Sequence, residues 1–388
     1  MKIGVLTHLR SEDNYGQILQ AYALQKYLIS KGHYAYLIQY YSDNNKSNKY
    51  LFFIKKCIRR IIGVFSKSRR EAYEKIQFYQ KLSKENSIKN KARKFLEFKT
   101  ENLNLSKVYT SFHELQIEAP EADAYIVGSD QVWNPSLLNP NTAAWYLKFG
   151  KTTTKRLSYA ASIGRTISKD EETMFANYLH NLDAISLREK NAWEYCLNLG
   201  FDKSKLVVDP TVLSPFSIYE SFIDKNAKPQ KSYIFLYYLN VQNKEELAWE
   251  QLDSFISKQK LSLKSVSSSG YYPAQSLIPG NEDELLTIPE WLTAIYHSQY
   301  VVTTSFHGMV FAILMHKPFV IIPLTNQYKL GNGRIESLLL NIGLEDRLLS
   351  EKNNMDDIFA KEINWDEVDY KLSEMRLASE KFLEQALK

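Results

Sequence analysis

The sequence predicts an α/β protein built of two doubly wound domains in tandem. Short apolar runs that suit buried parallel strands alternate with segments whose apolar residues recur at helical spacing. This alternation runs to about residue 212, passes a polar stretch with two prolines, and then restarts. The length of 388 residues is enough for two domains that each have a core. We expect domains at 1–215 and 216–388, with a C-terminal helix over 365–388.

Strands and helices alternate in order through the first domain. The opening run (KIGVLT) reads as a buried strand, and a polar loop leads from it into a helix over 17–33. The apolar residues of that helix share one face, and Gly32 suits its C-cap. A strand at 34–40 completes a β–loop–α–β unit. Further strands that run into loops or helices are expected at 122–135, 155–164, 182–200 and 205–213.

The same pattern restarts beyond residues 214–232, which we interpret as a linker. Strands are expected at 233–239, 261–268, 300–305 and 318–323. Helices are expected at 244–259, 288–299, 308–317 and 333–344. Two such domains would face each other across a cleft, and open parallel sheets bind ligands beyond the carboxyl ends of their strands. The polar residues at those ends are therefore the candidate site residues.

The charge of the chain is unevenly distributed. Residues 46–107 carry 18 Lys and Arg against 5 Asp and Glu, although the whole chain is only +5. Within this basic segment, 51–65 places apolar residues on one helical face and basic residues largely on the other. One interpretation is a solvated helix that covers a core edge, and the other is a helix on an anionic membrane surface. Nucleic-acid binding is disfavoured because no recognised module accompanies the charge.

The chain also lacks the sequence marks of secretion and of a membrane span. Its N-terminal apolar run is too short for a signal peptide, and no stretch of about 18 apolar residues occurs. The two cysteines, Cys57 and Cys196, form no CxxC pair. We therefore expect a reduced, cytoplasmic protein, with peripheral contact at the inner face of the membrane if 51–65 binds lipid.

The loop after the first strand offers Asn14, Tyr15, Gly16 and Gln17, just before a helix. Backbone N–H groups at a helix N-terminus favour an anion or a hydroxyl-rich ligand. Asn14 can equally serve as the helix cap. The two interpretations are compatible.

Two further strand ends carry charged side chains. The motif GSDQVW places Ser129, Asp130 and Gln131 at one of them, where a carboxylate can act as a base, grip hydroxyl groups or cap a turn. The motif ISLREK places Arg188 at the other. Its guanidinium suits a carboxylate or phosphate ligand, and the alternative is a surface ion pair with Glu189.

The motif TTSFHG supplies Ser305, His307 and Gly308 where a strand should turn into a helix. A core histidine would replace an apolar residue inside the pattern, but His307 interrupts a polar turn. A functional histidine is therefore favoured over a structural one, and Gly308 would let a ligand approach the backbone closely.

A last candidate site is the motif LGNGRIE, in which a glycine-rich loop opens a helix. It carries Asn332 and Arg334 and makes a plausible anion site. It is no dinucleotide fingerprint, since the third glycine is missing. The chain has no P-loop, GxSxG, HExxH or convincing DxD motif, so we expect neither a cofactor nor a catalytic metal.

Seven motifs together resemble the polysaccharide pyruvyl transferase family. They occur in the order of that family and extend from about residue 3 to residue 342. The motifs are NYGQILQAYALQKYL, IVGSDQVWN, YAASIG, ISLREK, VVDPTVL, VVTTSFHGMVFAILMHKPFVII and NGRIESLL. Each motif alone is a weak signal, but seven in order are a strong one.

The resemblance implies a GT-B-like fold, with two Rossmann-like domains facing a cleft. It also implies transfer of the enolpyruvyl group of phosphoenolpyruvate to a sugar of a cell-surface polysaccharide precursor, often lipid-linked, to form a pyruvate ketal. His307 and Asp130 would then be catalytic. The donor would be bound by Arg188, Arg334, Ser305, Gly308 and Asn332. The acceptor would be bound by Asn14, Tyr15, Gly16, Gln17, Ser129 and Gln131.

The sequence departs from the family at one position. In characterised members the triplet ending in the histidine often reads Arg-Leu-His, whereas here it is Ser305-Phe306-His307. Arg334 or a lysine can take the place of the missing arginine, or the donor differs. The alternatives are a GT-B glycosyltransferase with a nucleotide-sugar donor and a non-catalytic glycan-binding or assembly protein.

Overall fold

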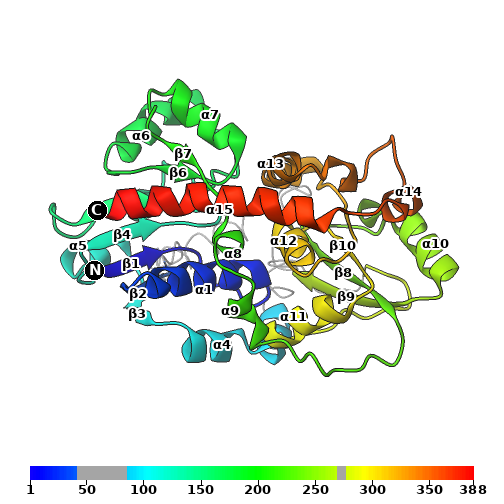
Figure 1. Ribbon diagram of the computed structural model, residues 1–388. Coiled ribbons are helices and arrows are strands. Elements are labelled where there is room, and N and C mark those ends of the chain that lie inside the picture. Colours follow the sequence, from blue (N-terminus) through cyan, green and yellow to red (C-terminus); the bar gives the residue numbers. More distant parts are fainter. Residues whose placement is uncertain (42–84, 269–276) are drawn as a thin grey trace, which may run out of the picture.

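The computed structural model describes residues 1–41, 85–268 and 277–388. The described chain forms two parallel sheets side by side, each covered by helices (Figure 1). The basic helix expected at 51–65 lies outside the described residues. Within the described ranges, none of the helices combines the length and the apolarity needed to cross a bilayer.

The first sheet has five parallel strands in the order β3-β2-β1-β4-β5. The central strand β1 is flanked on both sides, so its last four residues are buried. A short pair, β6 and β7, continues this sheet through parallel bridges from the chain around β5. These strands are β1 (Lys2–Leu6), β2 (Tyr34–Tyr40), β3 (Leu105–Tyr109), β4 (Ala124–Val127), β5 (Lys155–Ser158), β6 (Ser186–Leu187) and β7 (Lys205–Leu206).

The second sheet has four parallel strands in the order β11-β10-β8-β9. Its two inner strands, β8 and β10, are almost wholly buried, which matches their continuous apolar sequences. The strands are β8 (Tyr233–Leu239), β9 (Ser262–Ser268), β10 (Tyr300–Thr303) and β11 (Phe319–Ile321).

Helices cover both sheets. Those of the first half are α1 (Tyr15–Ser30), α4 (Phe95–Asn102), α5 (Phe112–Ile117), α6 (Lys169–Leu179), α7 (Lys190–Asn198) and the short α8 (Pro210–Leu213) and α9 (Ser217–Glu220). Those of the second half are α10 (Trp249–Gln259), α11 (Ile288–His297), α12 (Phe306–Leu314), α13 (Gly333–Ile342), α14 (Met355–Ala360) and α15 (Trp365–Leu387). Short 3₁₀ turns lie at 91–93, 140–146, 245–247, 326–332 and 345–347.

Several elements differ from the sequence expectation, each for a local reason. Helix α1 begins at Tyr15 rather than residue 17, because the Asn14 side chain accepts a hydrogen bond from the N–H of Gln17 and caps the helix there. The strand expected at 205–213 ends at Leu206, and α8 follows because Asp209 caps it and Pro210 starts it. Helix α12 begins at Phe306, so His307 lies inside its first turn.

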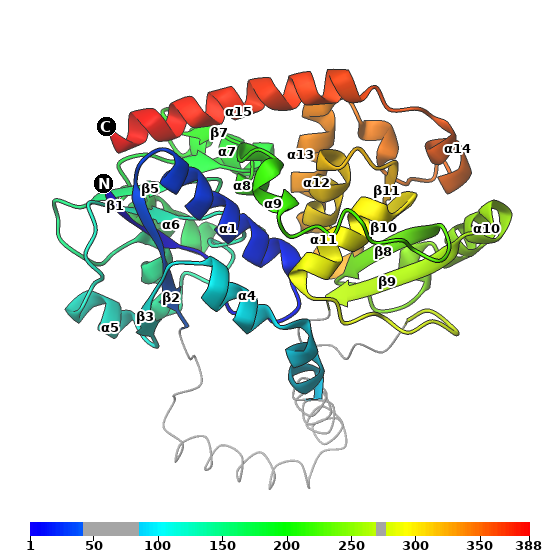
Figure 2. The same ribbon diagram turned by 60° about the horizontal axis from the view of Figure 1, so that its bottom comes forward.

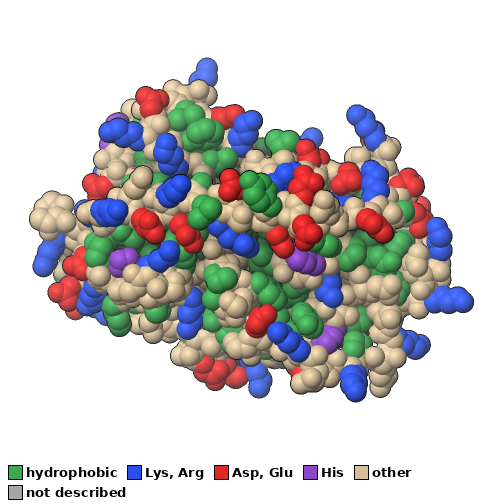
Figure 3. All heavy atoms as spheres, viewed as in Figure 1, with side chains coloured by type: hydrophobic (Ala, Val, Ile, Leu, Met, Phe, Trp, Pro, Cys, Tyr) green, Lys and Arg blue, Asp and Glu red, His purple; other side chains and the backbone are tan. Residues whose placement is uncertain are grey.

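The long helix α15 joins the two halves of the molecule. It leaves the second half near α14 and runs back across the first half, where the C-terminus lies near the N-terminus (Figures 1 and 2). The Oγ of Ser379 accepts a hydrogen bond from the N–H of Val208, and Arg376 donates to the carbonyl of Val212 at 2.6 Å. Acidic and basic side chains are mixed along this face rather than gathered in one patch (Figure 3).

Candidate active site

Polar residues that follow four strands meet between the two halves of the molecule. Asp130 follows β4, Arg188 follows β6, Asp209 lies beyond β7, and His307 follows β10. Within each sheet the strands are parallel, so their carboxyl ends lie at one edge. Contacts of His307 with Asp209 and of Arg334 with Asp130 show that the edges of the two halves face each other. The result is a buried cluster of charged side chains contributed by both halves of the chain.

Arg188 is the centre of this cluster. Its side chain is 2% exposed, and Nη1 donates to Oδ2 of Asp209 at 2.8 Å. Asp130 lies 3.7 Å from Nη2, and Glu189 lies 3.8 Å from Nε. Neither Nε nor Nη2 has a hydrogen-bond partner among the described residues. A buried guanidinium with two open donors can accept an anionic ligand.

Asp209 is a carboxylate of this cluster that accepts several hydrogen bonds. It was not identified as a site residue from the sequence. Its side chain is fully buried and accepts hydrogen bonds from the Ser129 hydroxyl, from Arg188, and from the N–H and hydroxyl of Thr211. Burial opposes its charge, but His307 and Arg188 hold the pKa of Asp209 well below its usual range. The motif VVDPTVL, with Asp before Pro and Thr after a strand, was the signal that could have revealed it.

His307 lies beside Asp209 at the start of α12. Its Nε2 is 3.6 Å from Oδ2 of Asp209, is buried, and has no hydrogen-bond partner in the described part of the chain. The Ser305 hydroxyl caps the helix by accepting from the N–H of Gly308 at 3.3 Å. The ring is therefore fixed by the helix start, with one nitrogen directed at a carboxylate and available for proton transfer.

Gly16 of α1 packs directly against the His307 ring. A Cβ atom on Gly16 would lie 2.1 Å from Cγ and Nδ1 of the imidazole. The sequence assigned Gly16 to acceptor binding, but in the structure its lack of a side chain makes room for His307.

We expect Gly16→Ala to displace the His307 ring and to lower the rate of the reaction about 100-fold, since a shift of about 1 Å in a reacting group costs that much. Helix propensity alone would favour alanine by about 0.5–1 kcal/mol, so a lower free energy of unfolding would report the clash. The measurements are kcat and denaturant unfolding of both proteins. An unchanged rate would contradict this placement of the ring.

Arg334 approaches the same cluster from the second half of the molecule. Its Nη1 lies 3.8 Å from Oδ1 of Asp130, and its Nε has no partner among the described residues. The guanidinium groups of Arg334 and Arg188 lie 5.8 and 5.0 Å from the centre of the Phe306 ring. Burial and the nearby charge of Arg188 lower the pKa of Arg334 to about 10. Such a group is stabilised by an anion.

Asp130 links the two arginines. Its backbone φ of 74° lies in the left-handed region, which aspartate tolerates better than most residues. Burial opposes the charge of its carboxylate, yet Arg188, His8 and Arg334 keep the pKa of Asp130 below its ordinary value. It is therefore an ionised group that bridges residues from both halves of the chain.

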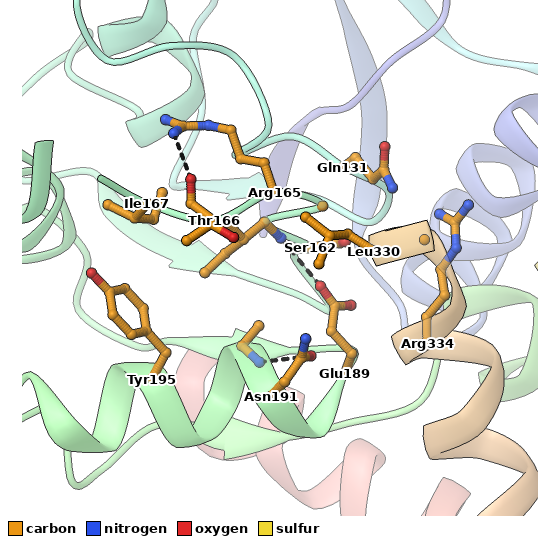
Figure 4. A pocket seen from close by; sticks show the side chains of 14 residues that line it. Gln131, Ser162, Arg165, Thr166, Ile167, Glu189, Asn191, Tyr195, Leu330 and Arg334 are labelled. Atoms are coloured by element: carbon orange, nitrogen blue, oxygen red, sulfur yellow. Dashed lines mark hydrogen bonds between the residues drawn. The ribbon is translucent and has the colours of Figure 1, made fainter. Parts of the chain in front are cut away.

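A pocket of about 200 Å³ opens beside Arg334 between the two halves. Gln131 and Arg334 lie at one end of it and Tyr195 at the other, with Glu189 between them (Figure 4). The full lining is Gln131, Ser162, Ile163, Gly164, Arg165, Thr166, Ile167, Glu189, Asn191, Ala192, Tyr195, Leu330, Gly331 and Arg334. A second pocket on the other side of Arg334 lies under α15 and has Arg188, Asp209 and Phe306 in its wall.

The sequence of residues 14–326 matches the family model described as polysaccharide pyruvyl transferase. This match covers more than half of the chain and includes Asp130, Arg188, Asp209 and His307. The chain belongs to the polysaccharide pyruvyl transferase family. Membership indicates a transferase. No curated relative matches the chain in sequence.

Solved structures agree on the GT-B fold. The UDP-N-acetylglucosamine 2-epimerase from Rickettsia bellii has a TM-score of 0.54 and 12% identity, with 99% of this chain and 95% of that chain covered. S. aureus MnaA, in a co-structure with UDP, has a TM-score of 0.50 and 13% identity, with 96% and 91% covered. At such identities the likeness shows the fold alone, and the predicted GT-B-like fold is confirmed.

The residues assigned to acceptor binding in this pyruvyl transferase family member have diverse environments. Gln131 lines the pocket, and Gln17 donates to Asp130 at 3.4 Å. Asn14 caps α1. Ser129 is buried, and its hydroxyl lies within hydrogen-bond distance of the carbonyl oxygen of Ala160 and of the Asp209 carboxylate. It therefore positions Asp209 and does not line the pocket.

Tyr15 requires a correction, because its side chain is inside the core that joins the two halves. Its ring stacks on Trp291 with centres 5.0 Å apart, and its hydroxyl donates to the carbonyl of Leu286 at 2.6 Å. Arg93 donates to the same hydroxyl at 2.6 Å. A fully buried tyrosine with both hydrogen bonds made has no surface left for a sugar.

We expect Tyr15→Phe to lower the free energy of unfolding by about 1–3 kcal/mol, since it leaves the buried Arg93 donor and the Leu286 carbonyl without their partner. Denaturant unfolding measures this change, and acceptor KM should stay the same. A raised acceptor KM with unchanged stability would instead support direct acceptor binding.

Two residues assigned to donor binding also have structural tasks. A Cβ on Gly308 would lie 2.4 Å from Oγ1 of Thr303, so the lack of a side chain at Gly308 allows α12 to pack against the end of β10. It does not make room for a ligand, as the sequence had suggested. The Asn332 amide is paired at both ends with the backbone of Leu324, at 2.9 Å each. It fixes the loop before α13 and so positions Arg334.

Proposed function

We propose that the protein transfers the enolpyruvyl group of phosphoenolpyruvate to a sugar of a cell-surface polysaccharide precursor and forms a pyruvate ketal. One observation carries this proposal beyond family membership. Two buried arginines and a histidine lie together between the two halves of the molecule, and among the described residues the Nε atoms of both arginines and the Nε2 of His307 have no hydrogen-bond partner.

Donor binding would depend chiefly on Arg334. Arg188 lies within 4 Å of three carboxylates, those of Asp209, Asp130 and Glu189. Among the described residues, Arg334 forms an ion pair with Asp130 at 3.8 Å, and Glu189 and Asp209 compensate its charge from farther away. Phosphoenolpyruvate brings a phosphate and a carboxylate, and its charge would stabilise the poorly compensated guanidinium. Arg334 lies over the ring of Phe306, next to Ser305. It can therefore take the place of the arginine that family members often carry at position 305.

His307 would move the protons of the reaction. As a sugar hydroxyl oxygen bonds to C2 of the donor, a proton is added to the methylene carbon. The C2–O bond to phosphate then breaks, inorganic phosphate leaves with the bonding electrons, and a second hydroxyl of the sugar bonds to C2. One hydroxyl proton ends on the methyl carbon and the other on phosphate. Asp209 would stabilise the imidazolium formed between the two transfers.

Direct binding of the donor tests this proposal. Calorimetry should detect phosphoenolpyruvate binding to the wild-type protein and at least tenfold weaker binding to Arg334→Gln. Arg165→Gln is the control, because Arg165 lines the same pocket but is paired with Glu171 at 2.6 Å. Absence of phosphoenolpyruvate binding to the wild-type protein would contradict the proposal that phosphoenolpyruvate is the donor.

The second candidate is a glycosyltransferase with a nucleotide-sugar donor. Ser305 in place of the arginine favours it, and S. aureus MnaA, which has the same fold, was determined with UDP. In the same calorimetric series, binding of UDP but not of phosphoenolpyruvate would support this candidate.

We further propose that the acceptor is lipid-linked and that 51–65 holds the protein at the inner face of the membrane. The alternation of apolar and basic residues in that segment supports this. Deleting 51–65 should abolish sedimentation with anionic vesicles while phosphoenolpyruvate binding persists. Vesicle binding that survives the deletion would remove the membrane proposal.

A further inference from the structure

A third pocket lies at the carboxyl end of the first sheet, outside the charged cluster. Its volume is about 200 Å³, which is below the roughly 300–1,000 Å³ typical of sites for drug-sized ligands and therefore leaves room for one sugar residue at most. Its walls come from the loop after β1, from the end of β2 and from the segment after β4. Three chain segments thus converge on a place where open parallel sheets bind ligands.

Aromatic rings form one part of this pocket and are held in fixed positions. The ring centres of His8 and Trp145 are 4.5 Å apart, and those of Tyr40 and Trp145 are 5.7 Å apart at an angle of 67°. The Tyr40 hydroxyl donates to the carbonyl of Asn141 at 3.1 Å. Tyr40 and Trp145 are 4% and 7% exposed, so the apolar surface that they contribute is small but rigidly held.

Polar groups form the rest of the wall. Arg10 is exposed and lies near enough to Tyr41 for its charge to act on that hydroxyl. Asn141 and Tyr41 are half-buried and also line the pocket. Fixed aromatic rings with a guanidinium, an amide and a phenol around them match a saccharide, whose C–H faces pack on rings and whose hydroxyls both donate and accept hydrogen bonds.

His8, which lines the third pocket, also lies against a residue of the candidate active site. Its Nε2 lies 3.3 Å from the carbonyl oxygen of Gln131. Gln131 follows Asp130 and lines the pocket between the two halves, at the end where Arg334 lies (Figure 4). The two pockets therefore have adjoining walls, with His8 on one side and Gln131 on the other.

We propose that the third pocket binds a sugar residue of the acceptor glycan adjacent to the one that reacts. This inference rests on the proposed function, because it takes the acceptor to be a saccharide. It assigns to acceptor recognition three residues that the sequence motifs left aside, namely Arg10, Tyr41 and Trp145.

Retention of oligosaccharides by the immobilised protein tests this inference. The probe is the pool released by mild acid from the surface polysaccharide of the cell that produces the protein. The test variants are Arg10→Ala and Tyr41→Leu, which avoid the buried Trp145. Tyr34→Leu is the matched control, since Tyr34 is an exposed tyrosine at the opposite end of the same strand β2.

We expect the wild type and Tyr34→Leu to retain the same oligosaccharides and both test variants to retain them at least about tenfold more weakly. Equal retention by all four proteins, or none by the wild type, would overturn the inference. A parallel calorimetric titration with phosphoenolpyruvate separates the two proposals. Glycan retention that is weakened in the variants, without phosphoenolpyruvate binding, would reject the proposed donor and support the third pocket as a glycan site. Phosphoenolpyruvate binding with unaltered glycan retention in the variants would support the donor and reject the glycan site.

Discussion

His307→Ala should lower pyruvyl transfer by about 100- to 10,000-fold while the protein stays folded. This is the usual loss when a general acid or base is removed. His307 is the histidine beside the arginine pair, and its Nε2 has no hydrogen-bond partner within the described structure. Asp209 keeps its bond to Arg188 in the variant, so the cluster is not left uncompensated. Steady-state kcat and thermal unfolding measure the two effects.

His316→Ala is the control for this substitution. His316 also lies near α12, but it is exposed, stacks on Trp365 and pairs with Asp369 on the outside of the molecule. Its removal should leave kcat within about twofold, in keeping with the small effects of most surface changes. Full function of His307→Ala in cells would contradict the catalytic role and support a non-catalytic glycan-binding or assembly protein.

Arg188→Met should lower the free energy of unfolding by about 3–5 kcal/mol and abolish donor binding. The substitution removes the arginine that lies against the buried carboxylates of Asp209 and Glu189, and it leaves Asp130 with Arg334 alone. Denaturant unfolding gives the stability change, and calorimetry gives phosphoenolpyruvate binding.

Two further variants separate the structural and binding effects of Arg188. The double variant Arg188→Met with Asp209→Asn should recover part of the lost stability, since one unpaired charge is removed, but no activity. Arg156→Met is the matched control. Arg156 is also buried but donates to four backbone carbonyls away from the cluster, so its loss should destabilise the fold and spare the site. An Arg188→Met protein as stable as wild type would contradict the account of the cluster.

The sequence predicted which charged residues meet because the parallel strands of each sheet place their carboxyl ends together. Asp130, Arg188 and His307 each stand directly after an apolar run, and this position is enough to predict that they meet. Arg334 was found by its glycine-rich loop and indeed lies at the same cluster. The expected helix start at residue 17 was two residues late, although Asn14, a strong N-cap residue, marks the observed start at Tyr15.

Other residues could not be assigned from sequence, because their tasks depend on contacts between distant segments. Tyr15 looks like a polar loop residue, yet it is buried against Trp291, which lies 276 positions later in the chain. Asp209 looked like the end of a strand, and only the fold brings it to Arg188 and His307. His8 belonged to no sequence motif, but it lies against the residue that follows Asp130.

The most direct test of the proposed function follows the donor carbon itself. The protein is incubated with phosphoenolpyruvate labelled with a carbon isotope at C2, together with the oligosaccharide pool, and the product is examined by NMR. We predict that the labelled carbon appears as a ketal carbon bonded to two sugar oxygens, with one inorganic phosphate released per ketal. Recovery of all the label as unchanged phosphoenolpyruvate, while UDP-linked sugars are consumed under the same conditions, would contradict pyruvyl transfer.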